Sequence, residues 1–508
     1  MKKTLLFAAT ALAMLASCSQ SDDLNNAPVV AETNQAVEFG TYVGKTPVTR
    51  AGTTGSITDD GANGTHTLKS VGFGVFGFYT DGTAYAANQT STKPNFMHNE
   101  HIYWNESGTG VSKWEYNPIK FWPNEFANGN VDDQDQAATG AAQHGLVSFF
   151  AYAPYVSSAS GSTGITAMSD KTLQANPTIT YTMAKNGDIV DLLWGTAGTN
   201  GVTATGSAQA GTTLSDATEV KRDGTTHYVV NADLNKMKTE GKVEFLFKHA
   251  LAKVGGSQVG ASPKNGLSVI LDVNRVGSAE KGEDKPTETK VTIKDITIEC
   301  TRMDIKKEYI YPEPGVDETG KILNRGVLDL ATGKWKYTSS DYADPEPGVN
   351  TYKHIIAAEG STSLWSTKDA EINASLAEPT TAQIASTWSN IPDGVLSSTA
   401  TNVYKDETNP LVFFPGTKPT LKFNITYVVR TQDSKLDGGW SEVQQNITKT
   451  VTFGEYVKLN NQYNILMHLG ITGVKFTATV SDWEIDGTDT DGDGIANATE
   501  VNLPINVQ

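Results

Sequence analysis

The sequence predicts an all-β protein built from antiparallel β-sandwiches. Its strongest segments are short, rich in β-branched and aromatic residues, and bounded by Gly, Pro, Asn or Asp. They are not separated by long stretches with a 3.6-residue period, which argues against helical bundles and coiled coils. Hydrophobic residues make up only 38% of the chain and charged residues 19%. The remainder is rich in Gly, Ser, Thr, Asn and Ala, as is typical of secreted β-rich proteins with long polar loops.

Length and charge narrow the possible organisation and partners. The chain has 508 residues, enough for two or three domains. Its formal net charge of -17 repels a nucleic-acid backbone and an anionic membrane surface, so we expect neither as a partner. The two cysteines, Cys18 and Cys300, lie too far apart in the sequence to indicate a disulfide framework.

The N-terminus has the pattern of an export signal. A basic start at residues 1–3 precedes an apolar run at 4–16 that is too short to span a bilayer permanently. The run ends in Leu-Ala-Ser-Cys18, which resembles the bacterial lipobox, so we expect residues 1–17 to be removed and Cys18 to carry a lipid anchor. Several acyl chains, such as palmitate, on one residue give stable anchoring. The alternative is an ordinary signal peptide with a chance cysteine.

A first strand is expected just after this segment. Val37, Phe39, Thr41 and Val43 alternate onto one face of an extended chain. The chain then turns into Gly- and Thr-rich sequence at Arg50-Ala51, where a protease can reach it.

The body of the chain divides into two parts of similar size. Strands are predicted at 71–79, 147–153, 243–247, 291–298, 410–415, 421–429 and 471–480. Polar stretches at 51–70, 126–145, 156–175 and 196–218 have little to bury, so we expect surface loops there. A break near 235–245 separates a domain at 51–240 from a second at 241–485, and residues 18–50 and 486–508 flank them.

The last eight residues form a strict alternation. Its aliphatic positions are Val501, Leu503, Ile505 and Val507. The tail has no obvious partner within its own domain, so we expect it to add as a strand to another subunit. Four buried aliphatics would contribute roughly 6–12 kcal/mol before ordering costs. Pro504 would remove one ladder hydrogen bond. A disordered tail and a final strand that pairs with its own domain are the alternatives.

A calcium-type loop precedes the tail. Its oxygen donors are spaced as in the pattern D-x-[DN]-x-[DN]-G-x₅-E, with Gly494 for the turn. The expected Ca²⁺ ligands are Asp489, Asp491, Asp493, the carbonyl of Ile495, Asn497 and Glu500. The flanking helices of an EF-hand are absent from the pattern, and the loop resembles thrombospondin type 3-like repeats. An acidic flexible linker is the alternative.

Five phrases in order resemble the fimbrillin family of pilins and surface lipoproteins. They lie at 119–123, 147–155, 191–194, 247–254 and 463–483, the last ending in Asp482-Trp483. The resemblance implies two tandem transthyretin-like β-sandwich domains, lipoprotein export to the outer membrane, and cleavage by an Arg-specific surface protease. On this sequence the cleavage position falls on Arg50-Ala51. The strand at 37–43 would then be removable, and an extended strand from a neighbouring fimbrial subunit would fill its groove.

The sequence contains no strong pattern for a catalytic site, and its histidine motif is a poor match to a metal site. His98-Asn-Glu100-His101 lacks the helical H-E-x-x-H arrangement, so we expect a solvated loop. We expect His249 to be a satisfied core histidine and Cys300 a buried hydrophobe. No nucleophile elbow, P-loop or Rossmann fingerprint occurs, so we predict that the protein is not an enzyme. An aromatic stretch that holds Tyr103, Trp104, Trp114, Tyr116 and Trp122 could stack on sugars, although sandwich core is the favoured interpretation.

The function predicted from sequence is therefore a structural subunit of a cell-surface fimbria. The first rival is a tip adhesin or glycan-binding lipoprotein that does not polymerise. The second is a surface hydrolase, which no visible constellation supports. The sequence does not identify the receptor, and the membrane contact expected is the lipid anchor alone.

Overall fold

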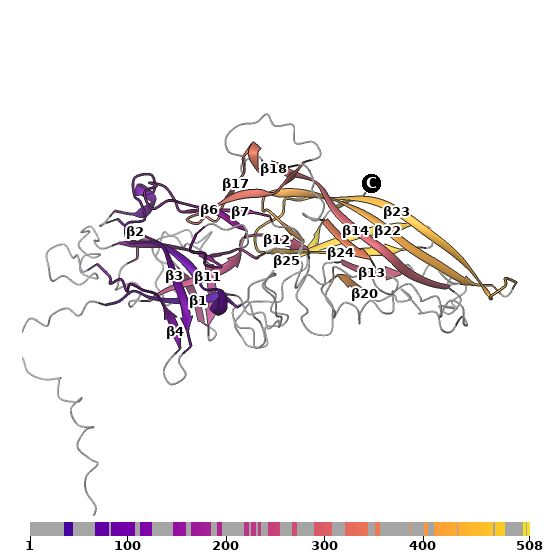
Figure 1. The fold of residues 1–508 in the computed structure, drawn as a ribbon, viewed down its shortest axis with the longest axis horizontal. Helices are drawn as coiled ribbons and strands as arrows, with labels where there is room; N and C mark the ends of the chain where they lie inside the picture. The colour runs from indigo at the N-terminus through magenta and orange to yellow at the C-terminus, as the bar shows by residue number, and fades with distance from the viewer. Residues whose placement is uncertain are drawn as a thin grey trace, which may run out of the picture.

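A computed structural model gives the fold (Figure 1). It describes residues 35–43, 67–80, 83–106, 112–123, 146–158, 164–183, 190–195, 218–222, 225–229, 232–234, 242–254, 267–271, 289–306, 321–343, 351–355, 388, 401–404, 411–433, 435–470, 473–482, 501–503 and 505–507. Strands dominate these residues, which confirms the all-β prediction. None of the helices in this part of the chain is long and apolar enough to cross a membrane.

The first sheet lies at the N-terminal end of the molecule (Figure 1). Its strands follow the spatial order β1 (Glu38–Val43), β11 (Lys242–His249), β8 (Leu193–Gly195), β5 (Val147–Ala153), β2 (Phe73–Tyr79), β3 (Met97–Asn105) and β4 (Lys113–Glu115). β1 runs parallel to β11, and the other pairs are antiparallel. Two one-turn helices, α1 (Leu68–Val71) and α2 (Tyr85–Asn88), flank β2.

The central strands of this sheet are buried on both faces. β5 is buried at every position, which matches its continuous apolar run rather than an alternating pattern. On one face Phe73 and Phe149 pack in a cluster with Phe39 and Phe245. On the other face residues such as Phe78 belong to a second cluster that extends into the rest of the molecule.

A smaller sheet joins the two halves of the chain. Its order is β17 (Trp335–Lys336), β16 (Arg325–Asp329), β7 (Thr178–Thr182) and β6 (Ile165–Met168). β7 and β16 pair antiparallel although about 150 residues separate them in sequence, with Val327 opposite Thr180. Two strand pairs stand apart from the larger sheets: β15 (Ile322–Leu323) with β18 (Tyr342–Ala343), which η6 (Ser339–Asp341) precedes, and β9 (Thr218–Arg222) with β10 (Thr225–Val229).

The C-terminal part is a two-sheet sandwich. One sheet contains β20 (Thr401–Tyr404), β13 (Leu267–Leu271), β24 (Asn461–Leu469), β12 (Ala252–Val254), β21 (Leu411–Phe413), β25 (Val474–Asp482) and β26 (Val501–Leu503). The other contains β19 (Thr351–Ile355), β14 (Thr289–Ile305), β22 (Thr417–Gln432), β23 (Trp440–Phe453) and β27 (Ile505–Val507). Facing residues interdigitate: the rings of Phe423 and Phe476 are 4.7 Å apart. The long strands β14, β22 and β23 extend away from the first sheet (Figure 1).

Most predicted strands are confirmed, and two expectations are wrong. The predicted loop at 156–175 contains β6, whose Ile165 is fully buried. The expected domain boundary at 240/241 is also displaced, because β11 belongs to the first sheet and the chain leaves that sheet only after His249. β11 was assigned to the second domain because its apolar pattern does not reveal which sheet it joins.

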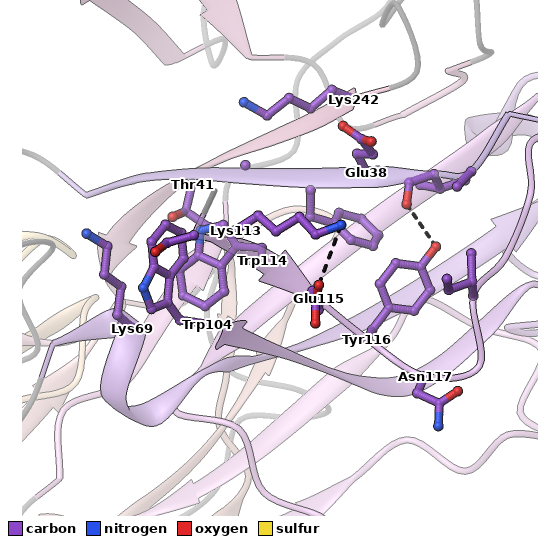
Figure 2. A pocket seen from close by; sticks show the side chains of 16 residues that line it. Glu38, Thr41, Lys69, Trp104, Lys113, Trp114, Glu115, Tyr116, Asn117 and Lys242 are labelled. Carbon is purple, nitrogen blue, oxygen red and sulfur yellow. Dashed lines mark hydrogen bonds and ion pairs between the residues drawn. The ribbon is translucent and has the colours of Figure 1, made fainter. Parts of the chain in front are cut away.

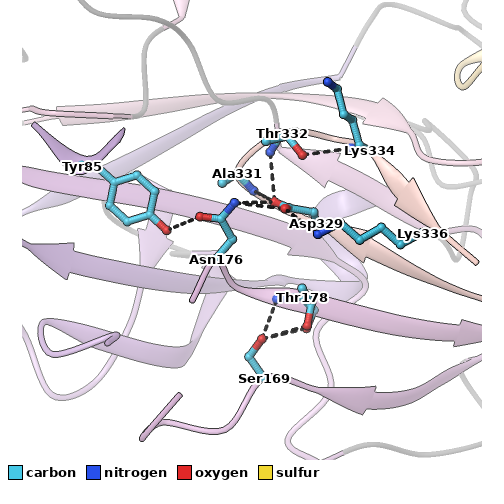
Figure 3. Close-up of polar contacts among 9 residues, drawn as sticks. All are labelled: Tyr85, Ser169, Asn176, Thr178, Asp329, Ala331, Thr332, Lys334 and Lys336. Carbon is cyan, nitrogen blue, oxygen red and sulfur yellow. Dashed lines mark hydrogen bonds and ion pairs between the residues drawn. The ribbon is translucent and has the colours of Figure 1, made fainter. Parts of the chain in front are cut away.

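A polar network connects the two parts at the small sheet (Figure 3). The Tyr85 hydroxyl donates to Asn176 Oδ1 at 2.9 Å, and Asn176 Nδ2 donates to both carboxylate oxygens of Asp329 at 3.0 and 3.2 Å. Asp329 also accepts from the backbone N–H groups of Ala331 and Thr332. This buried carboxylate therefore ties α2 to the β16–β17 turn.

Candidate functional site

The candidate site begins with β1, the edge strand of the first sheet. Its ladder with β11 spans the whole strand, from Glu38 opposite Lys242 to Val43 opposite Phe247. Val37 and Phe39 are buried while Glu38 is exposed, which confirms the predicted alternation at these positions. Thr41 is half-buried, and the side chain of Val43 lies outside the described residues.

Phe39 anchors the strand. Its ring has Phe73, Tyr116, Phe149 and Phe245 as neighbours, at centroid distances of 5.4 to 6.4 Å. Burying one such side chain contributes about 1.5–3 kcal/mol, so β1 is held by its side chains as well as by its ladder.

The start of β1 is also held from its other side. The Val37 N–H donates to the Lys120 carbonyl at 3.0 Å, and the Trp122 N–H donates to the Gln35 carbonyl at 2.9 Å. The Tyr116 hydroxyl donates to the Val37 carbonyl at 2.8 Å. Residues 35–37 are therefore clamped against the 116–122 segment that follows β4.

This clamp brings the two edges of the first sheet together around a cavity. Figure 2 shows this cavity between β1 and the β3–β4 hairpin. The volume of the cavity is about 770 Å³. We call it the edge pocket. It is lined by Ala36, Val37, Glu38, Phe39, Gly40, Thr41, Lys69, Trp104, Ser112, Lys113, Trp114, Glu115, Tyr116, Asn117, Ile119 and Lys242.

The predicted aromatic stretch divides into two groups. Trp122 and Tyr116 are buried in the first sheet's cluster, which confirms the core interpretation for them. Trp104 and Trp114 are only half-buried and form a wall of the edge pocket, and Tyr103 is exposed. The sequence could not separate these groups, because all five residues lie in strand-like phrases.

The tail is paired within its own chain. β26 adds to β25, with Leu503 opposite Ala478, and β27 adds to β23, with Val507 opposite Val451. Ala478 and Val451 are both buried. The expectation that the tail lacks a partner in its own domain is thus wrong. The alternative of a self-pairing final strand describes this monomer, because the tail occupies the edges of both sheets of the sandwich.

Pro504 separates the two pairings. Leu503 is the last residue of β26 and Ile505 the first of β27, so the chain changes sheets across the proline. Pro504 itself lies outside the residues that the structure describes, so the loss of one ladder hydrogen bond there stays a prediction.

Several predicted residues lie outside the part of the chain that the structure describes. They are Cys18, Arg50, Ala51 and the expected calcium ligands Asp489, Asp491, Asp493, Ile495, Asn497 and Glu500. Within the described residues, no group of three or more His, Cys, Asp or Glu side chains could hold a metal ion.

The histidine motif lies in a strand rather than in a solvated loop. His98, Glu100 and His101 belong to β3. His98 Nε2 lies 2.9 Å from the Ser169 carbonyl oxygen, and the His101 ring stacks on Tyr155 at 3.9 Å. Burial lowers the pKa of His101 and raises that of Glu100, so the neutral forms of both are favoured. The predicted solvated loop is wrong, because the polar residues of this motif lie within the strand β3.

His249 and Cys300 are both buried, as the sequence predicts. His249 is buried, with Nδ1 2.6 Å from Asp191 Oδ2 at the end of β11. Cys300 is buried in β14, and burial raises the pKa of its thiol to about 12. Neither side chain reaches the edge pocket.

The comparisons with known proteins agree with this architecture. The chain is 23% identical over 342 residues to the fimbrium subunit Fim1C of Phocaeicola vulgatus, covering 64% of this chain and 67% of that protein. A fimbrial protein from Bacteroides vulgatus has a similar structure, with a TM-score of 0.50 and 18% identity over 89% of this chain and 100% of that one. The chain is therefore similar in sequence to a fimbrium subunit and shares its fold with a fimbrial protein.

Other comparisons add little to this assignment. A putative cell adhesion protein from Bacteroides uniformis covers 81% of this chain and 91% of its own at 10% identity, with a TM-score of only 0.31. No family model matches the sequence. The sequence similarity therefore rests on the curated relative from Phocaeicola vulgatus, and the likeness of fold rests on the structure from Bacteroides vulgatus.

Proposed function

We propose that this protein is a structural subunit of a cell-surface fimbria that polymerises by strand exchange and contributes to adhesion. The chain would be exported as a lipoprotein on Cys18 and cleaved after Arg50 by an Arg-specific protease. The cleaved segment would take β1 with it. The tail of a neighbouring subunit would then occupy the vacated edge of β11.

The position of β1 is the observation that carries this proposal. β1 is an edge strand, and among the described strands it pairs with β11 alone. It can therefore leave the sheet without separating two other strands. Its departure would uncover aromatic rings such as Phe245 and Phe149, which Phe39 covers. An exposed edge with apolar rings is a template for strand addition.

The tail supports the proposal by its length and pattern. β1 has six residues, and 501–507 has seven with the same alternation. β1 pairs with β11 in the parallel direction. The proposal does not require the replacement strand to run in that same direction along β11. The tail's pairing with β25 and β23 means that it must leave its own sandwich before it can serve a neighbour.

Limited proteolysis tests this function. The uncleaved chain is treated with an Arg-specific protease, the new N-terminus is identified by mass spectrometry, and unheated samples are run on SDS gels. We expect oligomer ladders only after cleavage at Arg50, and none with Arg50→Gln. Lys45→Gln, a change at a neighbouring cation, is the matched control and should polymerise. Clean cleavage with only monomer would exclude homopolymerisation and favour the tip adhesin.

A further inference from the structure

The edge pocket has the size and composition of a small-ligand site. Its volume of about 770 Å³ lies within the roughly 300–1,000 Å³ typical of ligand pockets. Its lining combines four aromatic side chains with five charged ones. Neither strand exchange nor the lipid anchor accounts for this cavity.

Two half-buried tryptophans form its most distinctive wall. The rings of Trp104 and Trp114 lie 5.3 Å apart at 72°, so they present a corner rather than a flat stack. Trp114 also packs edge-on against the core ring of Phe73 at 5.0 Å, which fixes its position. The Lys69 ammonium lies 4.6 Å from the centroid of Trp104. Figure 2 shows both indoles facing the cavity beside Thr41 and Lys69.

The polar rim carries both signs of charge. Lys113 pairs with Glu115 at 3.5 Å, and Asn105 Nδ2 donates to Glu115 Oε2 at 2.8 Å. Lys242 pairs with Glu244 at 3.1 Å, and the exposed Glu38 lines the same cavity. A rim that carries both hydrogen-bond donors and acceptors suits a ligand whose groups can donate and accept, such as hydroxyls. It suits a phosphate or a polyanion less well.

The closed end of the pocket disfavours an extended peptide. Tyr116 already donates to the Val37 carbonyl, and residues 35–37 pair directly with 120–122. A strand that entered along β1 would meet this clamp and would find backbone groups there already in use. A compact ring-shaped ligand meets no such obstacle.

We propose that the edge pocket binds pyranose units of a neutral oligosaccharide. A pyranose presents an apolar C–H face, which an indole ring can cover, and a rim of hydroxyls for Lys113, Glu115, Asn117 and Glu38. Indole rings are suited to this role because each joins a large apolar face to a polar N–H.

The pocket contains β1, so saccharide binding belongs to the uncleaved chain. Residues 36–41 supply part of the lining, and their removal would open the cavity. This consequence rests on the proposed function, whereas the binding itself does not. A bound saccharide would stabilise the form that retains β1 and slow its release after cleavage at Arg50, because a ligand that binds one state shifts the population toward it.

A glycan array with the uncleaved chain, followed by calorimetry, tests the proposal. The array holds neutral, sialylated and sulfated oligosaccharides, and in the calorimetry a peptide of sequence 501–508 is added as a competitor of the bound saccharide. We expect a neutral oligosaccharide to bind and Trp104→Ala to weaken it at least about tenfold, or about 1.4 kcal/mol. Trp104→Phe should retain part of the binding. Trp440→Ala, which changes another half-buried tryptophan in β23, should bind as the unaltered chain does.

Four results would overturn the proposal: no neutral ligand binds, only sialylated or sulfated ligands bind, the peptide competes for the pocket, or Trp104→Ala and Trp440→Ala behave alike. Circular dichroism of each variant distinguishes lost binding from lost folding. Lys113→Ala, at a largely exposed position, tests separately whether the polar rim contributes to saccharide affinity. Failure of polymerisation in the protease assay would leave this result unchanged, so the two proposals fail separately.

Discussion

Phe39 of β1 lies nearly parallel to Phe245 of β11, with ring centroids 6.0 Å apart and an interplanar angle of 18°. This contact joins the strand that we propose to be removed to the strand that would receive its replacement. It also places Phe39 within the first sheet's apolar cluster. The same ring that stabilises the uncleaved chain would therefore uncover Phe73, Tyr116, Phe149 and Phe245 when β1 departs.

Removal of this ring should weaken the uncleaved chain. We expect Phe39→Ala to lower the free energy of unfolding by about 3–5 kcal/mol, the usual cost of deleting a buried phenylalanine. Denaturant unfolding followed by tryptophan fluorescence measures the loss. Glu38→Ala, at the exposed neighbour, should stay within about 0.5 kcal/mol. Equal effects at the two positions would show that β1 does not pack as described.

The clamp on β1 should make stability sensitive to alkaline pH. Burial raises the pKa of Tyr116 to about 12, above its usual value of 10.0. Between pH 10 and 12 the Tyr116 hydroxyl is deprotonated in the unfolded chain but still protonated in the folded chain. The contribution of Tyr116 to the free energy of unfolding is therefore complete below pH 10 and is lost as the pH rises towards 12. Tyr116→Phe should flatten the pH dependence of unfolding by about one proton in this window. An unchanged slope would contradict the burial of this hydroxyl against Val37.

The polar network at the small sheet should hold the two parts of the molecule together. Asp329→Ala leaves the half-buried Ala331 N–H and Asn176 amide without their carboxylate acceptor, while the Thr332 N–H keeps the Asp329 backbone carbonyl. A hydrogen bond to a charged group contributes about 1.5–3 kcal/mol, so we expect a clear fall in melting temperature. Lys336→Ala removes only a half-exposed partner at 3.9 Å and is the matched control. A larger effect from Lys336 would contradict the network.

The proposed calcium loop gives a direct metal test. We expect calorimetry to detect Ca²⁺ binding to the uncleaved chain and Asp491→Ala with Asp493→Ala to abolish it, because a hard cation needs clustered carboxylate oxygens. Asp437→Ala, at an exposed acid in the β22–β23 turn, should have no effect. Binding that persists in the double variant would exclude this loop as the site.

The sequence predicted the strands better than their partners. Segments such as 147–153 and 421–429 were identified because period and residue type are local properties. The pairing of β7 with β16, and of β1 with β11, joins residues far apart in sequence, and no local pattern encodes such choices. β6 was missed because its four residues lie within a polar stretch.

The candidate site was predicted in the same uneven way. The alternation at Val37 and Phe39 indicated a strand with one buried face, and the structure confirms it. The alternation at Val501 and Leu503 correctly indicated a strand, but its partner edges on β25 and β23 are set by tertiary structure. The edge pocket was not predicted, because it arises only when the two edges of a curled sheet meet.

A disulfide lock on the tail tests the central claim most directly. Thr479 and Asn502 are opposite each other in the β25–β26 ladder, and a cysteine pair there would hold the tail on its own sandwich. Thr426→Cys with Asn446→Cys, an opposed pair within β22–β23 away from the β23–β27 ladder, is the control that leaves the tail free.

After cleavage at Arg50, we expect the oxidised Thr479→Cys, Asn502→Cys protein to remain monomeric and to polymerise once a reductant opens the bond. The control pair should polymerise in both states. Oligomer ladders of equal intensity from the oxidised lock and the oxidised control would contradict polymerisation by the C-terminal strand.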